Sequence, residues 1–443
     1  MKLPRHVATT AQLAAAHPFW GEPGYGRTGS YMGQDLFGAP FWFDPFQLYA
    51  AGVVTSPNMA VVGQIGRGKS AMVKSLLWRQ AVLGRQGWVL DPKGEYGALA
   101  AAWGVRPIRI APGGQVRLNP LDAAGGSGAG PGGGADLLCS LAEVTMRRSV
   151  TPRERAAVVA AVTMAAREQP PTTVPAVVDQ LMRPTQFSAS ALSTDVRALA
   201  EDGRDVALEL RRLVNGDLAG LFDGPTTPGL DLDAPLVVLD LSPLYGSKGL
   251  GVLMTCALAW MGARLMTGDG VKRYVVVDEA WALLSELTTA RWLQASWKLS
   301  RAWGVSNVVV VHRATDLAAV GPRGSQVAGL AEGLLLDSET KVIFAQPASE
   351  ARRAASLLDL GSSEESLLPR LGRGLALWKV GGRSFLVRHR LGGEERALVD
   401  TDAAMGQVPR ATETGGVAAH PRGTGFWPLR PVTAGASSRP EAR

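Results

Sequence analysis

The sequence has little cysteine and no long uninterrupted apolar run. Its two cysteines, Cys139 and Cys256, are too few for a disulfide framework, which fits a reducing compartment. The first twenty residues lack the continuous apolar stretch of a signal peptide. The most apolar helical stretch, residues 251–266, is short for a bilayer span and contains Arg264. We therefore expect a cytoplasmic protein with no transmembrane segment, which reaches the inner face of the membrane through partners if at all.

A concentrated basic segment is also missing. The formal net charge is +7 over 443 residues, and no single cluster of Lys and Arg stands out. Nucleic-acid binding usually leaves such a cluster, so the charge alone leaves direct DNA binding open. The length allows one large α/β domain with an insertion, or two smaller domains.

Apolar strands alternate with helix-length segments through much of the chain. The first strand, residues 59–62, is followed by a glycine-rich turn and an amphipathic run over residues 69–83. The next strand, residues 87–90, ends at Asp91, and a third strand candidate covers residues 105–111. This alternation predicts an α/β fold with a mostly parallel sheet.

The second half of the chain contains further strand patterns. Four apolar strands separated by helix-length segments are expected at residues 236–239, 274–277, 308–311 and 341–344. Residues 372–391 predict a C-terminal β-hairpin with a glycine turn.

Composition divides the chain into segments. Residues 123–134 are nearly all Gly, Ala and Ser, and residues 135–221 show apolar spacing typical of helices. The expected organisation is an irregular lead-in (1–55), an α/β core (56–122 and 230–395), a flexible glycine-rich loop plus helical insertion (123–229) and a disordered tail (396–443).

The glycine-rich turn fits the phosphate-binding pattern G-x-x-x-x-G-K-S between a strand and a helix. Backbone N–H groups and the helix start attract phosphate, Lys69 neutralises its charge, and Ser70 ligates Mg²⁺. The nucleotide-binding residues are expected to be Gly63, Gln64, Ile65, Gly66, Arg67, Gly68, Lys69, Ser70 and Ala71. A plain glycine turn is the alternative.

Two adjacent carboxylates follow the strand at residues 274–277. Asp278 is expected to complete the Mg²⁺ site, and Glu279 to act as the catalytic base toward water. Such residues often only cap a helix, but together with the phosphate loop they indicate a Mg²⁺-dependent ATPase.

Two further groups follow strands and so are expected at the same edge of the sheet. Asp91-Pro-Lys-Gly-Glu95 is either a turn closed by a contact of Lys93 with Asp91 or Glu95, or an acidic contribution to the nucleotide or subunit interface. His312 is either a sensor of the γ-phosphate or a core histidine. We favour the sensor.

Ring ATPases complete their site with an arginine from a neighbouring subunit, which stabilises the growing phosphate charge. Arg301 is the first choice for this catalytic role, and a solvated helix charge is the alternative interpretation. Arg313, Arg323 and Arg352 remain open.

Taken together, these motifs resemble those of the conjugal-transfer and type IV secretion ATPases, a branch of the superfamily that includes HerA and FtsK. The resemblance spans about residues 58–350 and includes Arg117-Leu-Asn-Pro-Leu-Asp122, Leu218-Ala-Gly-Leu-Phe-Asp-Gly-Pro225, Asp278-Glu-Ala-Trp281 and His312-Arg-Ala-Thr-Asp316. It implies a RecA-like motor domain with an all-helical insertion between the two nucleotide motifs. It also implies a homohexamer at the cytoplasmic face of a DNA- or protein-transfer channel.

The sequence departs from this family at two places. His312 stands where the family usually has glutamine, and only about 55 residues precede the first core strand, where secretion ATPases carry a large docking domain. We expect an ATP-hydrolysing ring motor for conjugative DNA transfer or type IV secretion. A HerA- or FtsK-like DNA translocase and a nucleotide-gated scaffold of a transfer complex are the alternatives.

Overall fold

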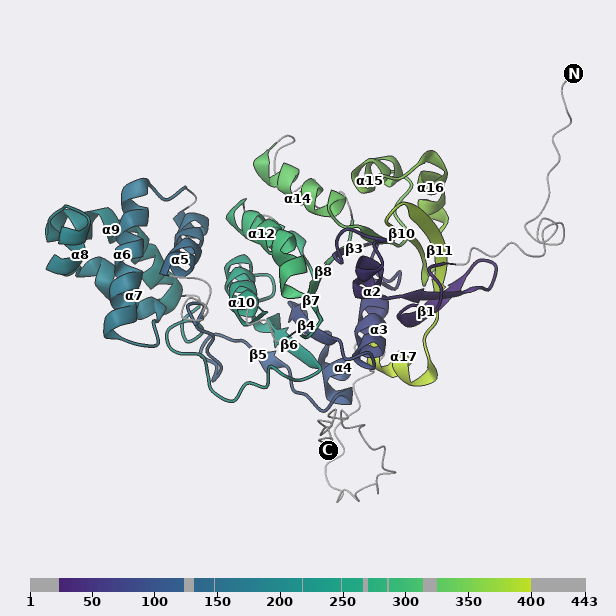
Figure 1. Ribbon diagram of the computed structural model, residues 1–443, viewed down its shortest axis with the longest axis horizontal. Helices are drawn as coiled ribbons and strands as arrows, with labels where there is room; N and C mark the ends of the chain where they lie inside the picture. The colour runs from purple at the N-terminus through teal and green to yellow at the C-terminus, as the bar shows by residue number, and fades with distance from the viewer. Residues whose placement is uncertain are drawn as a thin grey trace, which may run out of the picture. The chain divides into compact units, whose positions relative to one another are not determined.

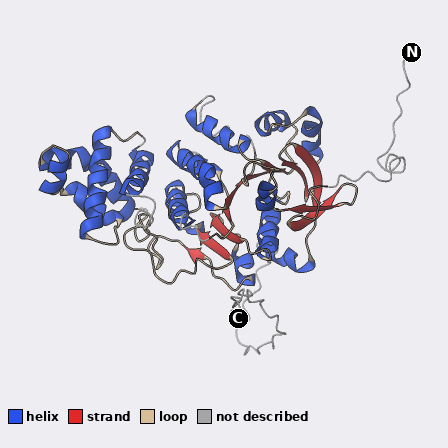
Figure 2. Ribbon diagram, in the orientation of Figure 1, coloured by secondary structure: helices blue, strands red, loops and turns tan. Residues whose placement is uncertain are grey.

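The computed structural model describes residues 24–122, 131–146, 148–216, 218–247, 249–265, 270–284, 287–313 and 325–399. They form an eleven-stranded sheet in the order β2-β1-β11-β10-β9-β3-β8-β7-β4-β6-β5 (Figures 1 and 2). The strands are β1 (Ser30–Asp35), β2 (Pro40–Phe43), β3 (Met59–Val62), β4 (Gln86–Asp91), β5 (Ile108–Arg109), β6 (Leu236–Asp240), β7 (Arg273–Val277), β8 (Val305–Val311), β9 (Thr340–Ile343), β10 (Leu375–Val380) and β11 (Arg383–His389).

Helices make up most of the rest. They are α2 (Pro45–Ala50), α3 (Lys69–Ala81), α4 (Gly97–Ala102), α5 (Pro131–Met146), α6 (Pro152–Glu168), α7 (Val174–Met182), α8 (Gln186–Ala191), α9 (Val196–Asn215), α10 (Leu250–Leu265), α11 (Trp281–Leu284), α12 (Leu287–Trp303), α14 (Gln326–Leu336), α15 (Ala351–Leu358), α16 (Ser362–Leu367) and α17 (Gly393–Val399), with 3-10 turns η1 (Ser242–Leu244) and η2 (Leu368–Arg370). No described helix has the length and apolar content that a bilayer span needs.

The sheet is parallel in its central part. Every neighbouring pair from β9 to β5 runs parallel, whereas β10, β11, β1 and β2 join by antiparallel pairing. The carboxyl ends of β3, β8, β7 and β4 therefore meet at one edge. The predicted α/β fold is confirmed, with its mostly parallel sheet, the helices α5–α9 between the two nucleotide motifs and the C-terminal hairpin of β10 and β11.

Apolar side chains cover both faces of the sheet because each buried strand alternates between them. In β7, Val275 and Val277 belong to one core cluster, together with residues of α10, α12 and α14. Tyr274 and Val276 belong to the other cluster, with residues of α2, α3 and α4. The near-continuous valine runs are thus explained by a sheet buried on both faces.

The lead-in differs from the irregular segment expected from the sequence. It forms β1 and β2, and β1 joins the sheet by pairing with β11. Alternate aromatic residues of β2 are buried, and the rings of Phe41 and Phe43 pack against Trp378 of β10. Asp44 then begins α2 by accepting hydrogen bonds from the N–H groups of Phe46 and Gln47. These distant partners are invisible to local pattern reasoning.

Three other expected boundaries also shift. The third strand is only Ile108–Arg109. Of the glycine-rich segment, residues 131–134 belong to α5 and residues 123–130 lie outside the described residues. Residues 396–399, assigned to the tail, are the last turn of α17, and residues 400–443 lie outside the described residues.

Candidate nucleotide-binding site

The phosphate-loop sequence connects the end of β3 to the start of α3. Gly66 and Gly68 have φ angles of 74° and 110°, in the left-handed region that favours glycine. Lys69 is the first residue of α3, and Ser70 and Ala71 follow in its first turn. The loop therefore presents a helix N-terminus, which attracts anions.

The base of the loop is fastened to both neighbouring strands. The N–H of Gly63 donates to the carbonyl of Val311 at 3.3 Å, and the N–H of Gln64 donates to the carbonyl of Ala345 at 3.1 Å. Gly63 also packs so closely on β9 that an added Cβ would lie 2.4 Å from the Cβ of Phe344. These contacts fix where the rest of the loop lies.

Lys69 is buried beneath this loop, with 5% of its surface exposed. Its Nζ donates to the carbonyl of Gln64 at 3.0 Å. Burial lowers the pKa of Lys69 to about 8, and the charges of Asp278 and Glu279 partly offset that effect. An anion that binds in the loop would stabilise the charged form of this buried lysine.

Asp278 follows β7 and is also buried, with 7% of its surface exposed. Burial and the charges of Glu279 and Glu95 raise the pKa of Asp278 to about 7. A buried carboxylate whose ionised form is disfavoured is stabilised when a cation binds beside it. Hydroxyl and carboxylate oxygens, such as those of Ser70 and Asp278, are suitable ligands for Mg²⁺. No three described His, Cys, Asp or Glu side chains form a metal cluster.

Glu279 has both carboxylate oxygens occupied by hydrogen-bond donors. Oε1 accepts a hydrogen bond from Nε2 of His312 at 2.8 Å and forms an ion pair with Lys93. Oε2 accepts from the indole N–H of Trp281. Burial opposes ionisation of Glu279, but hydrogen bonds from His312, Lys93 and Trp281 outweigh it and hold the pKa at about 2. Its backbone φ of 53° is unusual for a residue other than glycine.

The Asp91–Glu95 turn does not close through Lys93 as one interpretation of the sequence expected. The carboxylate of Asp91 instead accepts hydrogen bonds from the N–H groups of Glu95 at 3.0 Å and Tyr96 at 2.9 Å. Asp91 therefore shapes the turn into α4, and the ammonium of Lys93 is left to reach Glu279.

His312 and the candidate arginines lie at different places. The structure brings His312 next to Glu279 at the carboxyl edge of the sheet. Arg301 is exposed in the last turn of α12, which leads into the amino end of β8, and so lies away from the site of its own chain. Arg313 pairs with Glu350 at 3.0 Å, whereas the Arg352 side chain is 94% exposed. Arg323 lies outside the described residues.

Sequence reasoning missed several contacts of this site. The indole of Trp281 was recognised only as part of a motif, and Lys93 was given other partners. The N–H of Gly374, before β10, donates to the carbonyl of Arg67 at 3.0 Å and so supports the phosphate loop from a distant segment. A lone glycine before a hairpin carries no local signal of this contact.

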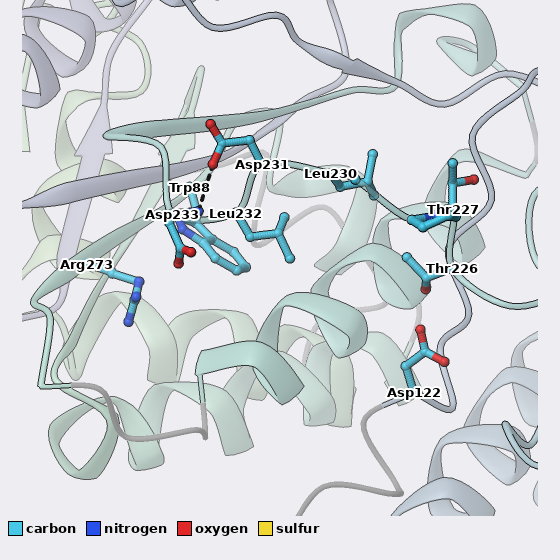
Figure 3. A pocket seen from close by; sticks show the side chains of 11 residues that line it. Trp88, Asp122, Thr226, Thr227, Leu230, Asp231, Leu232, Asp233 and Arg273 are labelled. Atoms are coloured by element: carbon cyan, nitrogen blue, oxygen red, sulfur yellow. Dashed lines mark hydrogen bonds between the residues drawn. The ribbon is translucent and has the colours of Figure 1, made fainter.

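A separate pocket of about 430 Å³ is shown in Figure 3. Trp88 of β4 and Arg273, the first residue of β7, line it with Asp231 and Asp233. Because Arg273 begins its strand and Asp278 follows it, the pocket and the phosphate loop lie at opposite edges.

The chain was compared with known proteins. No protein-family model and no curated protein matches it. Among solved structures it is similar to VirB4 of Thermoanaerobacter pseudethanolicus, with a TM-score of 0.68 and 21% identity over 84% of this chain and 100% of that chain. It is also similar to plasmid coupling protein TrwB in complex with ADP and Mg²⁺, with a TM-score of 0.52 and 12% identity over 88% of this chain and 95% of that chain.

A second TrwB structure, in complex with the non-hydrolysable ATP analogue ADPNP, has a TM-score of 0.50 and 13% identity over 76% of this chain and 86% of that chain. These similarities confirm the RecA-like P-loop ATPase fold predicted from the motifs.

Proposed function

We propose that this protein is a Mg²⁺-dependent ATPase. The observation that carries the proposal is the meeting of Lys69, Asp278 and Glu279 at the carboxyl edge of one parallel sheet. A triphosphate needs a cationic cradle, a metal ligand and a group that accepts a proton from water. These three side chains supply one of each.

Each group has a defined role in this proposal. Residues 63–71 hold the phosphates, and the ammonium of Lys69 neutralises the β- and γ-phosphates. Ser70 and Asp278 would hold Mg²⁺, which would neutralise charge on the phosphate oxygens. Glu279 orients and deprotonates the attacking water. His312 lies at hydrogen-bond distance from Glu279, where a γ-phosphate sensor is expected.

We further propose that the ATPase is the ring motor of a conjugative DNA-transfer or type IV secretion system. Similarity to VirB4 over all of that chain, and to TrwB, described as a bacterial conjugative coupling protein, supports this role. Its partners would be further copies of itself in a homohexamer, components of the transfer channel, and DNA. Partners would place it at the inner face of the membrane, on the cytoplasmic side.

ATP turnover by the purified protein with Mg²⁺ tests the proposal. Lys69→Ala is expected to abolish tight ATP binding or turnover, because the phosphates lose their main side-chain partner. Lys272→Ala is the matched control, because this exposed lysine precedes β7 at the opposite edge of the sheet. Wild-type turnover in Lys69→Ala would refute the site.

The cargo and the mechanical role need further measurements. Stimulation of turnover by duplex DNA that weakens with salt would favour the HerA- or FtsK-like translocase. ATP binding without hydrolysis, with or without DNA and membrane partners, would favour the nucleotide-gated scaffold.

A further inference from the structure

We propose that Lys93 is a positioning residue that senses the terminal phosphate and controls the catalytic base. Lys93 forms an ion pair with Glu279. When ATP binds, its γ-phosphate draws the ammonium away and leaves Glu279 free to accept a proton from water. This inference rests on the proposed ATPase function and adds the step that links ATP binding to activation of the base.

The geometry around Glu279 shows what Lys93 contacts. Nζ of Lys93 and Nε2 of His312 lie 3.4 Å apart, and both contact Oε1 of Glu279. The indole N–H of Trp281 contacts Oε2. Three donors therefore converge on a carboxylate that is 3% exposed. A carboxylate with three donors can still accept a hydrogen bond from water, but the ion pair with Lys93 stabilises its negative charge and so makes Glu279 a weaker proton acceptor.

Lys93 is the donor best placed to leave. It lies on the turn between β4 and α4 beside Gly94, whose φ is 72°. His312, by contrast, directly follows the buried strand β8, and Trp281 begins α11. A lysine ammonium on a four-carbon stem also exchanges partners more easily than an indole or an imidazole on a strand end.

The chemistry of the surroundings identifies the anion that competes with Glu279. Lys93 follows β4 and Lys69 begins α3, so both lie at the carboxyl edge of the sheet, where the positive charge of Lys93 helps to lower the pKa of Lys69. The centroid of the Tyr245 ring lies 5.9 Å from Nζ of Lys93. Two ammonium groups at the edge that carries the phosphate loop favour an extended polyanion. The triphosphate of ATP would reach Lys93 with its last phosphate, which ADP lacks.

A double-mutant cycle on nucleotide affinity tests the switch without using turnover. Dissociation constants for ADPNP and ADP are measured for the wild type, Lys93→Met, Glu279→Gln and the double variant. Glu279→Gln weakens the ion pair and frees the ammonium, so its preference for ADPNP over ADP should rise by about tenfold, a coupling typical of close charge pairs. In the Lys93→Met background the same substitution should change this preference by less than about twofold.

Matched variants separate this outcome from general charge effects. Lys93→Arg should preserve the coupling, and Lys272→Met, on an exposed lysine at the opposite edge, should leave the ADPNP preference of the wild type unchanged. Lys93→Met alone leaves the buried Glu279 without its ion pair and risks unfolding. In that event Glu279→Gln is compared directly with the double variant, since neither contains the unpaired carboxylate. The preference for ADPNP over ADP should be about tenfold greater in Glu279→Gln than in the double variant.

The results distinguish the two proposals. If wild-type protein binds neither nucleotide, the ATPase proposal fails and this inference fails with it. If the wild type binds both nucleotides but Glu279→Gln has the same effect with and without Lys93, the ATPase proposal stands and Lys93 is not the sensor.

Discussion

At the scale of single residues, the lack of a Cβ atom at Gly63 allows the phosphate loop to keep its position. Gly63 lies against the backbone and Cβ of Phe344, and its N–H is used by the carbonyl of Val311. The G-x-x-x-x-G-K-S pattern requires this glycine, but the reason here is close packing rather than a left-handed backbone: Gly66 and Gly68 have positive φ, and Gly63 does not. Substitution at Gly63 is therefore expected to cause overpacking, whereas substitution at Gly66 or Gly68 would strain the backbone.

Gly63→Ala is expected to displace the loop or β9, because Phe344 occupies the place of the new methyl group at 2.4 Å. Overpacking of this kind lowers the free energy of unfolding by about 1–3 kcal/mol. We also expect weaker ADPNP binding. Denaturant unfolding and nucleotide titration measure the two effects.

The control is Gly329→Ala in α14, where no atom lies within 4 Å of the added Cβ. Alanine in an exposed helix is expected to stabilise by about 0.5–1 kcal/mol. If Gly63→Ala and the wild type were equally stable, the loop would be able to accommodate the added methyl group beside Phe344, and the prediction would be wrong.

At the scale of elements, the last described helix is attached to the helix that begins with the phosphate loop. Glu395 of α17 forms an ion pair with Arg79 of α3 at 2.5 Å, and it accepts hydrogen bonds from Ser75 at 3.4 Å and from the N–H of Gly392 at 2.7 Å. Side-chain exposure of the pair is 14% for Arg79 and 10% for Glu395. The contact joins residues more than 300 positions apart.

Glu395→Ala is expected to release α17 from α3 and to lower the free energy of unfolding by about 2 kcal/mol, because a largely buried arginine loses its carboxylate. Glu394→Ala changes the neighbouring, exposed carboxylate of the same helix and should have little effect. Urea unfolding gives the stability, and hydrogen exchange in α17 gives the local effect. Unchanged protection in α17 would show that other contacts hold the helix.

At the scale of the whole molecule, the proposed ring assigns each ATP site residues from two copies. Within its own chain Arg301 lies toward the edge of the sheet opposite the nucleotide site, so it would act only on a neighbouring subunit. Arg313 and the open side chain of Arg352 are the described alternatives.

Mixing two inactive variants tests the arrangement. Arg301→Ala is expected to bind ATP but not to hydrolyse it, and Lys69→Ala is expected not to bind it. In mixed rings an intact site of the first variant receives an intact arginine from the second, so turnover should return to a measurable fraction of wild type. Turnover near wild type in Arg301→Ala alone would exclude Arg301, and the same design would then apply to Arg313 and Arg352.

Local pattern was enough to predict much of the architecture. Valine-rich runs such as residues 308–311 predict strands buried on both faces, and the carboxyl ends of such strands meet at one edge in any parallel sheet. The expected places of Lys69, Asp278 and His312 at that edge follow from this rule. The boundaries of β6 to β9 lie within a few residues of those expected, because the apolar runs that predict these strands are local features of the sequence.

The rest depended on contacts between distant segments. The pairing of β1 with β11 and of β2 with β1 made strands of a lead-in that has no helical period. The carboxylate of Asp91 accepts hydrogen bonds from the N–H groups of Glu95 and Tyr96. Lys93 pairs with Glu279 instead.

The sequence by itself therefore determined the kind of molecule, because strand period, glycine spacing and strand-end carboxylates are local properties. Only the tertiary structure decided which side chains contact Glu279. Lys93 and Glu279 lie far apart along the chain, and β4 and β7 bring them together because the two strands pair side by side. Three donors then meet one buried carboxylate, and the balance among them is a property of the folded protein alone.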